Sequence, residues 1–303
     1  MQTQDLLKLT ATVLLSLSLA TTAVAEDKFK NVEIKTIHVG DGIYMLTGQG
    51  GNIGLSVGTD GVFLIDDQFA PLTEKIKAAI ATFSDQPVRF LLNTHWHPDH
   101  TGGNVNMGKT GTVIVAHDNV RKRLAVDNFI EMFGMEVPAM DSTGLPIITF
   151  DNALTFHLNG NEIHISHASN AHTDGDSIVY FRDANVIHTG DIYFAGMYPF
   201  IDTHSGGSTE GVISALDRVL AMSDNKTVII PGHGPVSDKN SLAAYTDMLK
   251  TVSSRMRKMI AEQLTLEQIL AAEPTKDFDK QYGNGFIKNT AFVEMLYADM
   301  TTG

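Results

Sequence analysis

A short segment of the chain carries four side chains of the kinds that bind divalent metals. Residues 91–104 read LLNTHWHPDHTGGN, and His95, His97, Asp99 and His100 fall within six positions. Zinc and similar ions accept imidazole and carboxylate ligands. In an extended segment side chains alternate, so the first two histidines can share one ion, while Pro98 turns the backbone and re-aims the other two ligands. The loop therefore predicts ligands for two metals; histidines placed by accident in a polar surface loop are the alternative.

Three more residues of ligand type each follow a predicted strand. His172 lies in SNAHTDGDS, Asp191 in HTGD and His233 in IIPGHGP. Glycines beside such residues let the backbone approach a buried ion closely. Each residue alone is a weak signal, because a lone loop histidine is more often incidental. Together with the first loop they form a set of seven candidate ligands.

Apolar segments separated by turn signals predict strands in two groups. The first group covers residues 32–38, 43–46, 53–57, 62–65, 88–92 and 113–116. The second group covers residues 147–150, 154–158, 162–167, 178–181, 186–188 and 228–230. Glycine-containing turns between the first four segments predict a β-meander.

Helical spacing of apolar residues predicts the segments that cover these strands. Residues 71–83, 119–133, 210–222 and 240–263 are expected to be helical, and residues 135–146 to form a loop. Two sheets packed face to face with helices outside would give each apolar face a partner. We expect a catalytic domain at residues 26–264 and, at residues 265–303, an extension of two short helices packed on it.

Composition excludes several classes of protein. The formal net charge is −13, and no cluster of Lys and Arg stands out, so a nucleic-acid partner is not expected. The chain has no cysteine, which excludes disulfides, thiolate zinc sites and a cysteine nucleophile. Any metal must therefore be held by histidine and carboxylate.

The first residues predict a secretory signal at residues 1–25. Lys8 precedes a mostly apolar run at residues 9–20, and an A-x-A pattern ends at Ala25. A retained membrane anchor is the alternative, but the run is shorter than the roughly 20 residues that a spanning helix needs. We expect an exported protein, periplasmic in a Gram-negative host, with no membrane association after cleavage.

The seven candidate ligands, in their order, resemble those of the metallo-β-lactamase superfamily of binuclear metallohydrolases. The resemblance spans about residues 32–263 and implies an α+β fold, a four-layer αββα sandwich with the metals in a cleft at one edge of the two sheets. It also implies two zinc ions, although iron or manganese can occupy such ligands. His95, His97 and His172 would hold the first ion, Asp99, His100 and His233 the second, and Asp191 would bridge both.

Departures from the patterns of individual branches indicate which branch of this superfamily the chain resembles most. β-Lactamases with a cysteine on the second metal are excluded, because Asp191 stands at that place. Other dinuclear β-lactamases share the first loop but lack the bridging aspartate. The chain is more similar to glyoxalase II-like and general metallohydrolase branches, and residues 170–177 and 189–194 resemble exported members near a quinoprotein-associated branch. Glyoxalase II itself is less favoured, because its glutathione thioester substrate is cytosolic and this chain lacks that family's basic substrate-binding tail.

The resemblance implies hydrolysis of a small-molecule substrate. Two divalent ions lower the pKa of a shared water to about 7, and the resulting bridging hydroxide would attack a carbonyl carbon. Asp99 would orient the water and shuttle its proton. We expect an exported zinc hydrolase that acts on an ester, amide, lactam, lactone or thioester bond. The alternatives are a true β-lactamase, a non-catalytic periplasmic zinc-binding protein and, less favoured because no flavin domain is present, an iron redox protein.

Imidazole ligands need partners that fix their tautomers. Asp66 and Asp176 are candidates for this role, and His188 and His204 could border the cleft. Solvated turn carboxylates and structural histidines are the alternatives for these four. Phe69, residues 49–52 and residues 194–200 are expected to contact substrate.

Overall fold

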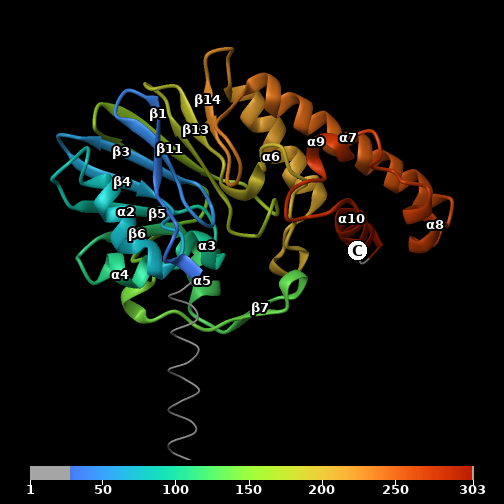
Figure 1. Cartoon of the computed structure of the whole chain (residues 1–303), viewed down its shortest axis with the longest axis horizontal. Coiled ribbons are helices and arrows are strands. Elements are labelled where there is room, and N and C mark those ends of the chain that lie inside the picture. The colour runs from blue at the N-terminus through green and yellow to red at the C-terminus, as the bar shows by residue number, and fades with distance from the viewer. Residues whose placement is uncertain (1–27, 302–303) are drawn as a thin grey trace, which may run out of the picture.

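The computed structural model describes residues 28–301 (Figure 1). The predicted signal at residues 1–25 lies outside the described residues. Among the described helices, none is both long enough and apolar enough to cross a membrane.

Two sheets form the centre of the molecule. The first has the order β1-β2-β3-β4-β5-β6-β9 and the second the order β10-β11-β12-β13-β14-β15. The first comprises β1 (Lys35–Gly40), β2 (Ile43–Thr47), β3 (Ile53–Gly58), β4 (Gly61–Ile65), β5 (Val88–Asn93), β6 (Val113–His117) and β9 (Ile148–Phe150). The second comprises β10 (Ala153–Leu158), β11 (Asn161–His167), β12 (Ser177–Phe181), β13 (Val186–His188), β14 (Val228–Ile230) and β15 (Ser237–Asp238).

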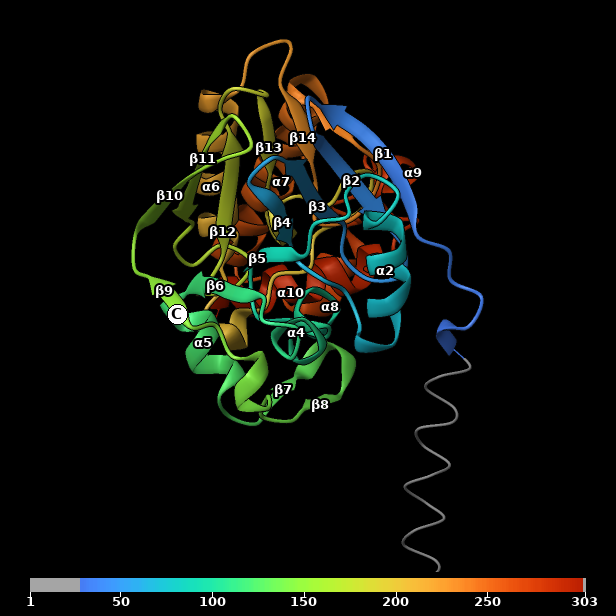
Figure 2. The same cartoon turned by 90° about the vertical axis from the view of Figure 1, so that its left-hand side faces the viewer.

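Helices cover the outer face of each sheet, as Figure 1 and the rotated view in Figure 2 show. On the first sheet lie α2 (Thr73–Ile80), α3 (Pro98–Thr101), α4 (Asn104–Gly108) and α5 (Asp118–Leu124). On the second lie α6 (Thr209–Met222) and α7 (Lys239–Ala261). The predicted α+β fold, a four-layer αββα sandwich, is confirmed.

Alternation along the strands explains these layers, because successive side chains of a strand point to opposite faces. In β4 Phe63 belongs to the apolar cluster between the sheets and Leu64 to the cluster under α2. In β14 Ile230 belongs to the central cluster and Ile229 to the cluster under α6 and α7. All four side chains are almost fully buried. Both faces of each sheet are therefore apolar and must be covered. The opposite sheet covers the inner face and the helices cover the outer face.

Parallel pairing brings the chemically important loops to one edge. Strand β5 pairs parallel with β4 and β6, and β13 pairs parallel with β14. Parallel neighbours end at the same edge of a sheet, so the loops that follow β4, β5, β13 and β14 gather there. These loops carry Asp66, the 95–100 segment, Asp191 and His233.

The helix predicted at residues 119–133 is wrong in its second half. Helix α5 ends at Leu124, and the chain then forms β7 (Asn128–Ile130), which pairs antiparallel with β8 (Met135–Val137). The Asn128 amide donates to the carbonyls of Arg123 and Val126 and so satisfies the end of the helix. The expected loop at residues 135–146 therefore begins with a strand, and the two strands form an arm at the lower side of Figure 1.

The C-terminal segment holds three helices instead of the two predicted. They are α8 (Leu266–Ala271), α9 (Asp279–Tyr282) and α10 (Asn289–Thr301). The Asp299 carboxylate accepts a hydrogen bond from Thr209 N at the start of α6, 2.9 Å away. Tyr198 N donates to the carbonyl of Tyr282 at 3.0 Å. The segment thus contacts the chain near the site loops; whether it is a separate extension stays a prediction.

Candidate metal centre

The seven predicted ligands come together at the shared edge of the two sheets. One group contains His95, His97, His172 and Asp191, and a second contains Asp99, His100 and His233. Within each group one ligand atom from every residue lies within 4.8 Å of all the others. These are the only such groups found among residues 28–301. Asp191, expected to be shared by both, falls in the first of them.

Local backbone geometry separates the two groups. The side chains of His95 and His97 both reach the first group, as alternation in an extended segment requires. Pro98 then begins α3, whose first turn carries Asp99 and His100 into the second group. Pro is favoured at a helix start because its missing N–H has no partner there.

Each of four histidines uses one ring nitrogen to contact a partner outside the cluster. His97 Nε2 lies 3.0 Å from an Asp202 carboxylate oxygen, and His172 Nδ1 lies 2.8 Å from the Phe200 carbonyl. His100 Nδ1 lies 2.7 Å from Asp66 Oδ2. These acceptors require the outer nitrogen to carry the proton.

His95 follows the same rule through Thr94. The Thr94 hydroxyl donates to Asp66 Oδ2 at 2.7 Å, so its oxygen is free to accept from His95 Nδ1 at 3.0 Å. The inner nitrogens of His95 and His172, whose rings burial keeps neutral, therefore present lone pairs to the cluster. His97 Nδ1 and His172 Nε2, the two nitrogens on the cluster side, lie only 2.9 Å apart. A contact this short is favourable only where a proton lies between the two nitrogens or a cation lies beside them.

Asp191 contacts both groups. Its Oδ1 lies 3.1 Å from His100 Nε2, and its Oδ2 lies 3.3 Å from His233 Nε2 and 3.7 Å from His172 Nε2. Asp99 Oδ2 lies 3.3 Å from His233 Nε2 and has the more exposed side chain of the two aspartates. The geometry thus places Asp191 between the groups and Asp99 at their open side.

Unpartnered buried atoms show that these residues fit divalent cations. Three of the buried atoms without a hydrogen-bond partner are His95 Nε2, His100 Nε2 and Asp191 Oδ1. The last two are 3.1 Å apart, yet their geometry is not that of a hydrogen bond. Leaving such atoms unpaired costs about 1–3 kcal/mol each, and a metal ion would supply the missing partner for all three.

The charge state of the metal-free cluster agrees with this fit. Burial lowers the pKa of His172 to about 4 and that of His95 well below its usual range, so both rings are neutral. Burial also opposes charge on His233, but Asp191 and Asp99 outweigh it and raise its pKa to about 9. The carboxylates that favour a proton at this position would equally favour a metal ion.

Two glycines permit this close packing. A Cβ added to Gly51 would lie 2.0 Å from His100 Cε1, and one added to Gly232 would lie 2.0 Å from Asp191 Oδ1. Such distances are not compatible with any side chain. The glycines of the 50–51 turn and of the Pro-Gly-His-Gly segment are therefore needed for the ligands to reach their positions.

Replacing Gly51 with alanine is expected to lower metal affinity by about 10–100-fold or more, because the methyl group displaces a ring that Asp66 and burial hold in place. Equilibrium dialysis against a zinc-selective chelator measures this affinity. Gly160→Ala is the control, since its Cβ meets nothing within 4 Å and brings only backbone strain. Equal metal affinity in Gly51→Ala and the wild type would contradict the geometry.

The predicted outer residues have different outcomes. Asp66, predicted as a partner of a ligand, contacts His100. Asp176 accepts from Thr173 N and Oγ1 at 2.7 and 2.6 Å and so supports the loop that follows His172, and burial raises its pKa to about 8. His188 is buried, lies 3.1 Å from the Asn52 carbonyl and accepts from Gly190 N. It supports the backbone before Asp191 and does not line the cleft.

The expectation for His204 is wrong. Its ring lies 3.1 Å from a Glu131 carboxylate oxygen, with 59% of the side chain exposed, and it is not among the residues of the cluster or its cleft. Two residues earlier, Asp202 is the side chain that supports His97. The sequence analysis missed Asp202, and the only available signal was its capping pattern: its carboxylate accepts from Ser205 N at the start of a short helix.

Replacing Asp202 with alanine is expected to weaken metal binding by about 10–100-fold, because His97 loses the acceptor that fixes its tautomer. Asp141→Ala is a matched control: Asp141 also caps a short helix, at Thr143 N, but is exposed and is not part of the cluster. Metal titration of both variants measures the difference. Equal affinities would mean that Asp202 has no such role.

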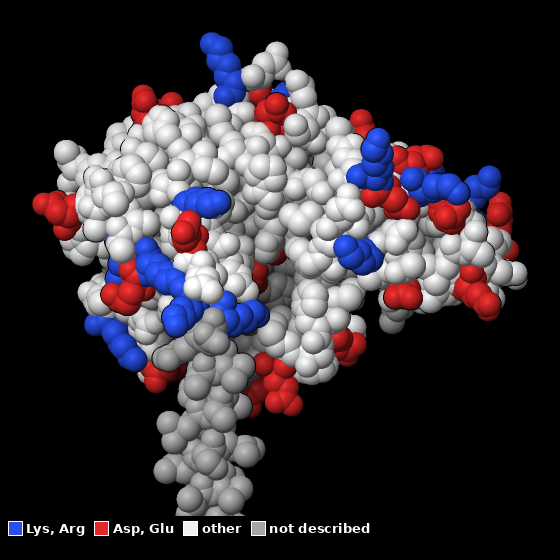
Figure 3. Space-filling model, viewed as in Figure 1, with Lys and Arg blue, Asp and Glu red and all other residues white. Residues whose placement is uncertain are grey.

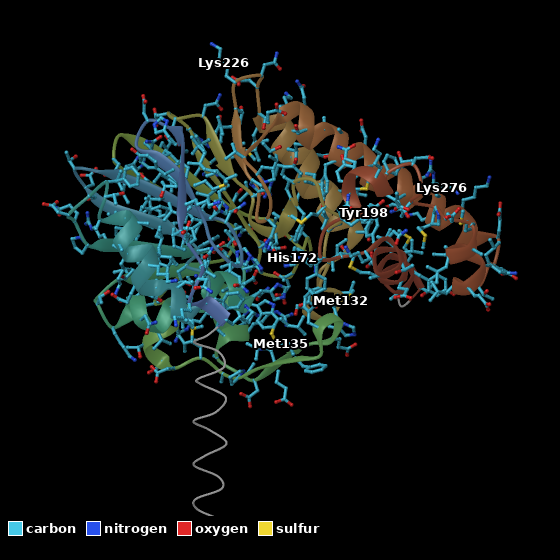
Figure 4. All side chains as sticks on the ribbon, viewed as in Figure 1. Met132, Met135, His172, Tyr198, Lys226 and Lys276 are labelled. Atoms are coloured by element: carbon cyan, nitrogen blue, oxygen red, sulfur yellow. The ribbon has the colours of Figure 1, made fainter. Side chains whose placement is uncertain are left out.

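The cluster opens into a cleft of about 210 Å³. Its lining includes His97, Pro98, Asp99, Asp191 and His233 from the cluster. Apolar side chains supply the rest: Phe69, Ile130, Phe133, Met135, Phe200 and Phe286. Phe69 and Phe200 were expected to contact substrate, whereas the contributions of the β7–β8 arm and of Phe286 were not. Figure 4 shows Met135 on the arm, and Figure 3 shows the hollow on this face.

A two-sheet sandwich with clustered His and Asp ligands beside an open cleft defines a metal-dependent hydrolase. Residues 46–233 match the profile of the metallo-beta-lactamase superfamily, and the chain belongs to this superfamily. The probable metallo-hydrolase YqgX of Bacillus subtilis (strain 168) is 30% identical over 189 residues, 58% of this chain and 85% of that protein. A probable hydroxyacylglutathione hydrolase of Schizosaccharomyces pombe is 25% identical over 203 residues, 66% of this chain and 67% of that protein.

Solved structures share the fold. A metallo-beta-lactamase from Pontibacter korlensis superposes with a TM-score of 0.60 at 21% identity, covering 72% of this chain and 99% of its own. The sec-alkylsulfatase Pisa1 from Pseudomonas sp. superposes with a TM-score of 0.69 at 14% identity, covering 88% of this chain and 50% of its own. At these identities the structures show the fold alone.

Proposed function

We propose that this metallohydrolase holds two zinc ions and cleaves an ester, amide, lactam, lactone or thioester bond of a small molecule. The ligands are the seven residues of the two groups, with Asp191 shared. The observation that carries the proposal is a set of three buried atoms without hydrogen-bond partners, His95 Nε2, His100 Nε2 and Asp191 Oδ1, within the seven-residue cluster beside an open cleft. Bound ions at this place would polarise a carbonyl group and make water a nucleophile near neutral pH.

The chain's own residues have separate tasks in this proposal. Asp99 is the carboxylate at the open side and reaches the cleft, so it would accept a proton from water as a general base and then return it to the leaving group. Phe200 stacks on the His97 ring at 5.7 Å and Phe194 on the His233 ring at 5.3 Å. These aromatic rings fix the ligands and keep water away from their faces.

A substrate panel tests the proposal. The full chain is loaded with zinc and assayed on p-nitrophenyl esters, a γ-lactone, a peptide amide, a glutathione thioester, nitrocefin and a carbapenem. Turnover of one class that disappears with EDTA and returns with zinc supports the proposal. Metal-loaded protein that hydrolyses nothing in the panel contradicts it.

A true β-lactamase is the second candidate. A type 2 metallo-beta-lactamase of Bacillus cereus is 22% identical over 192 residues, 63% of this chain and 69% of that protein. Nitrocefin and carbapenem hydrolysis that matches or exceeds ester hydrolysis would favour it. Asp191 argues against β-lactamase activity, because an aspartate occupies the position where one class of these enzymes has a cysteine ligand.

We also propose that the chain is exported after cleavage behind Ala25. The support is the apolar run and A-x-A pattern of residues 9–25. Expression in a Gram-negative host followed by fractionation and mass spectrometry is expected to find a periplasmic protein that begins at Glu26. A protein that retains Met1 in the cytoplasm would refute export.

A further inference from the structure

The apolar part of the cleft is assembled from segments that lie far apart in the sequence. Phe69 follows the first sheet's β4, Ile130, Phe133 and Met135 come from the β7–β8 arm, Phe200 precedes Asp202, and Phe286 lies between α9 and α10. Four distant segments thus converge on the open side of the metal centre with apolar side chains only.

Two of these aromatic side chains are partly exposed at the cleft. Phe133 and Phe286 are each 48% exposed, and their rings lie 6.4 Å apart across the cleft. Phe133 also contacts Phe200 at 5.1 Å, and Phe286 contacts the His233 ring at 5.5 Å. Exposed apolar surface that borders a polar site marks a place where an apolar ligand group is buried.

The charged groups of the cleft leave no partner for an anionic substrate tail. Among the described residues none of those lining it is Lys or Arg, and its only ionisable side chains are His97, Asp99, Asp191 and His233 of the metal centre. Basic side chains on this face lie beside the hollow (Figure 3). A carboxylate or sulfonate buried between the phenyl rings would lose its hydration without an ion pair in return.

We propose that the substrate is an uncharged ester or lactone whose apolar acyl chain lies between Phe133, Phe200 and Phe286. This inference rests on the proposed hydrolase function and names its substrate class. Phe133 and Phe286 determine specificity by contacting the chain, while the reacting carbonyl lies toward Asp99 and Asp191. Substrates with a negative charge on the acyl chain are poor ligands for the same cleft.

Matched esters test the substrate class. The zinc-loaded protein is assayed with p-nitrophenyl acetate, butyrate and hexanoate and with mono-p-nitrophenyl adipate, which has the six carbons of hexanoate with a carboxylate in place of the terminal methyl group. We expect kcat/KM to rise by up to about fourfold per methylene, since each buried CH2 contributes about 0.8 kcal/mol. We expect hexanoate to exceed the adipate ester by roughly tenfold or more.

Variants locate the effect in the cleft. Phe133→Ala and Phe286→Ala are expected to flatten the increase with chain length through KM, and Phe133→Lys to raise the relative rate for the adipate ester. Phe129→Ala is the matched control, because Phe129 lies on the same arm and is 52% exposed but does not line the cleft. It is expected to keep the chain-length dependence.

A binding measurement separates this inference from catalysis. Calorimetric titration of the zinc-loaded protein with 2-octanone, a ketone that cannot be hydrolysed, is expected to show binding that Phe133→Ala weakens and Phe129→Ala does not. If the wild type hydrolyses all four esters with equal kcat/KM, the inference is wrong and the proposed function stands. If 2-octanone binds but the metal-loaded protein cleaves no ester, the cleft binds an apolar chain as inferred, and the proposal that the substrate is an ester is wrong.

Discussion

Replacing Asp191 with alanine is expected to remove at least one of the two metal ions that we propose and to lower hydrolysis by about 10³-fold or more. Asp191 is the residue whose oxygens approach nitrogens of both groups, at 3.1 Å from His100 in the second group and 3.7 Å from His172 in the first. Loss of a shared ligand removes several kcal/mol of charge stabilisation, and each 1.36 kcal/mol is a factor of ten in rate. Metal analysis and steady-state kinetics on the most active ester measure both effects.

Asp183→Ala serves as the control for Asp191→Ala, because Asp183 is an exposed turn aspartate that caps the Glu162 amide. Circular dichroism and the melting temperature show whether each variant folds. A folded Asp191→Ala protein with full metal content and full activity would exclude a bridging role.

Replacing Asp99 with asparagine is expected to lower kcat by about 10²–10⁴-fold with a smaller change in KM. The amide keeps the shape of the side chain but cannot take up a proton, and general-base catalysis is worth about this factor. In the metal-free protein burial opposes ionisation of Asp99, but His100 and His233 outweigh it and lower its pKa to about 2. The carboxylate is therefore ionised at neutral pH, as a proton acceptor must be.

Asp118→Asn is the matched control for Asp99→Asn, since both aspartates lie in the first turn of a short helix and only Asp99 borders the cleft. Metal content must be measured alongside kcat, because Asp99 is also a proposed ligand. If Asp99→Asn turns over at the wild-type rate, the proton-transfer role is refuted.

Local patterns were sufficient to predict most of the fold. Strands such as Ile53–Gly58 and Val186–His188 are short apolar runs between glycine or asparagine turns, and their expected and observed bounds differ by at most one residue. The candidate ligands could be recognised because each follows such a strand, and parallel pairing takes strand ends to a common edge. Residue type and strand order were thus enough to select the candidate ligands.

Other parts of the site depend on tertiary contacts that no local pattern encodes. Residues 128–133 continue the helical spacing of apolar residues, but the Asn128 amide caps α5 at the Arg123 carbonyl and strand β7 pairs with β8. In the sequence Asp202 looks like any surface aspartate. Its role follows from its contact with His97, which lies 105 positions earlier in the chain. Phe286 reaches the cleft because the C-terminal segment folds back against Tyr198. Contacts between residues so far apart in the sequence cannot be inferred from the local spacing of residue types.

The central claim is that the two groups of His and Asp side chains hold two divalent ions. Inductively coupled plasma mass spectrometry on the purified full chain, after dialysis against zinc and removal of free metal, tests it most directly. We predict about two zinc ions per chain in the wild type and at most one in Asp191→Ala. Protein that is folded but binds no zinc, or that binds the same amount after the substitution, would contradict the account.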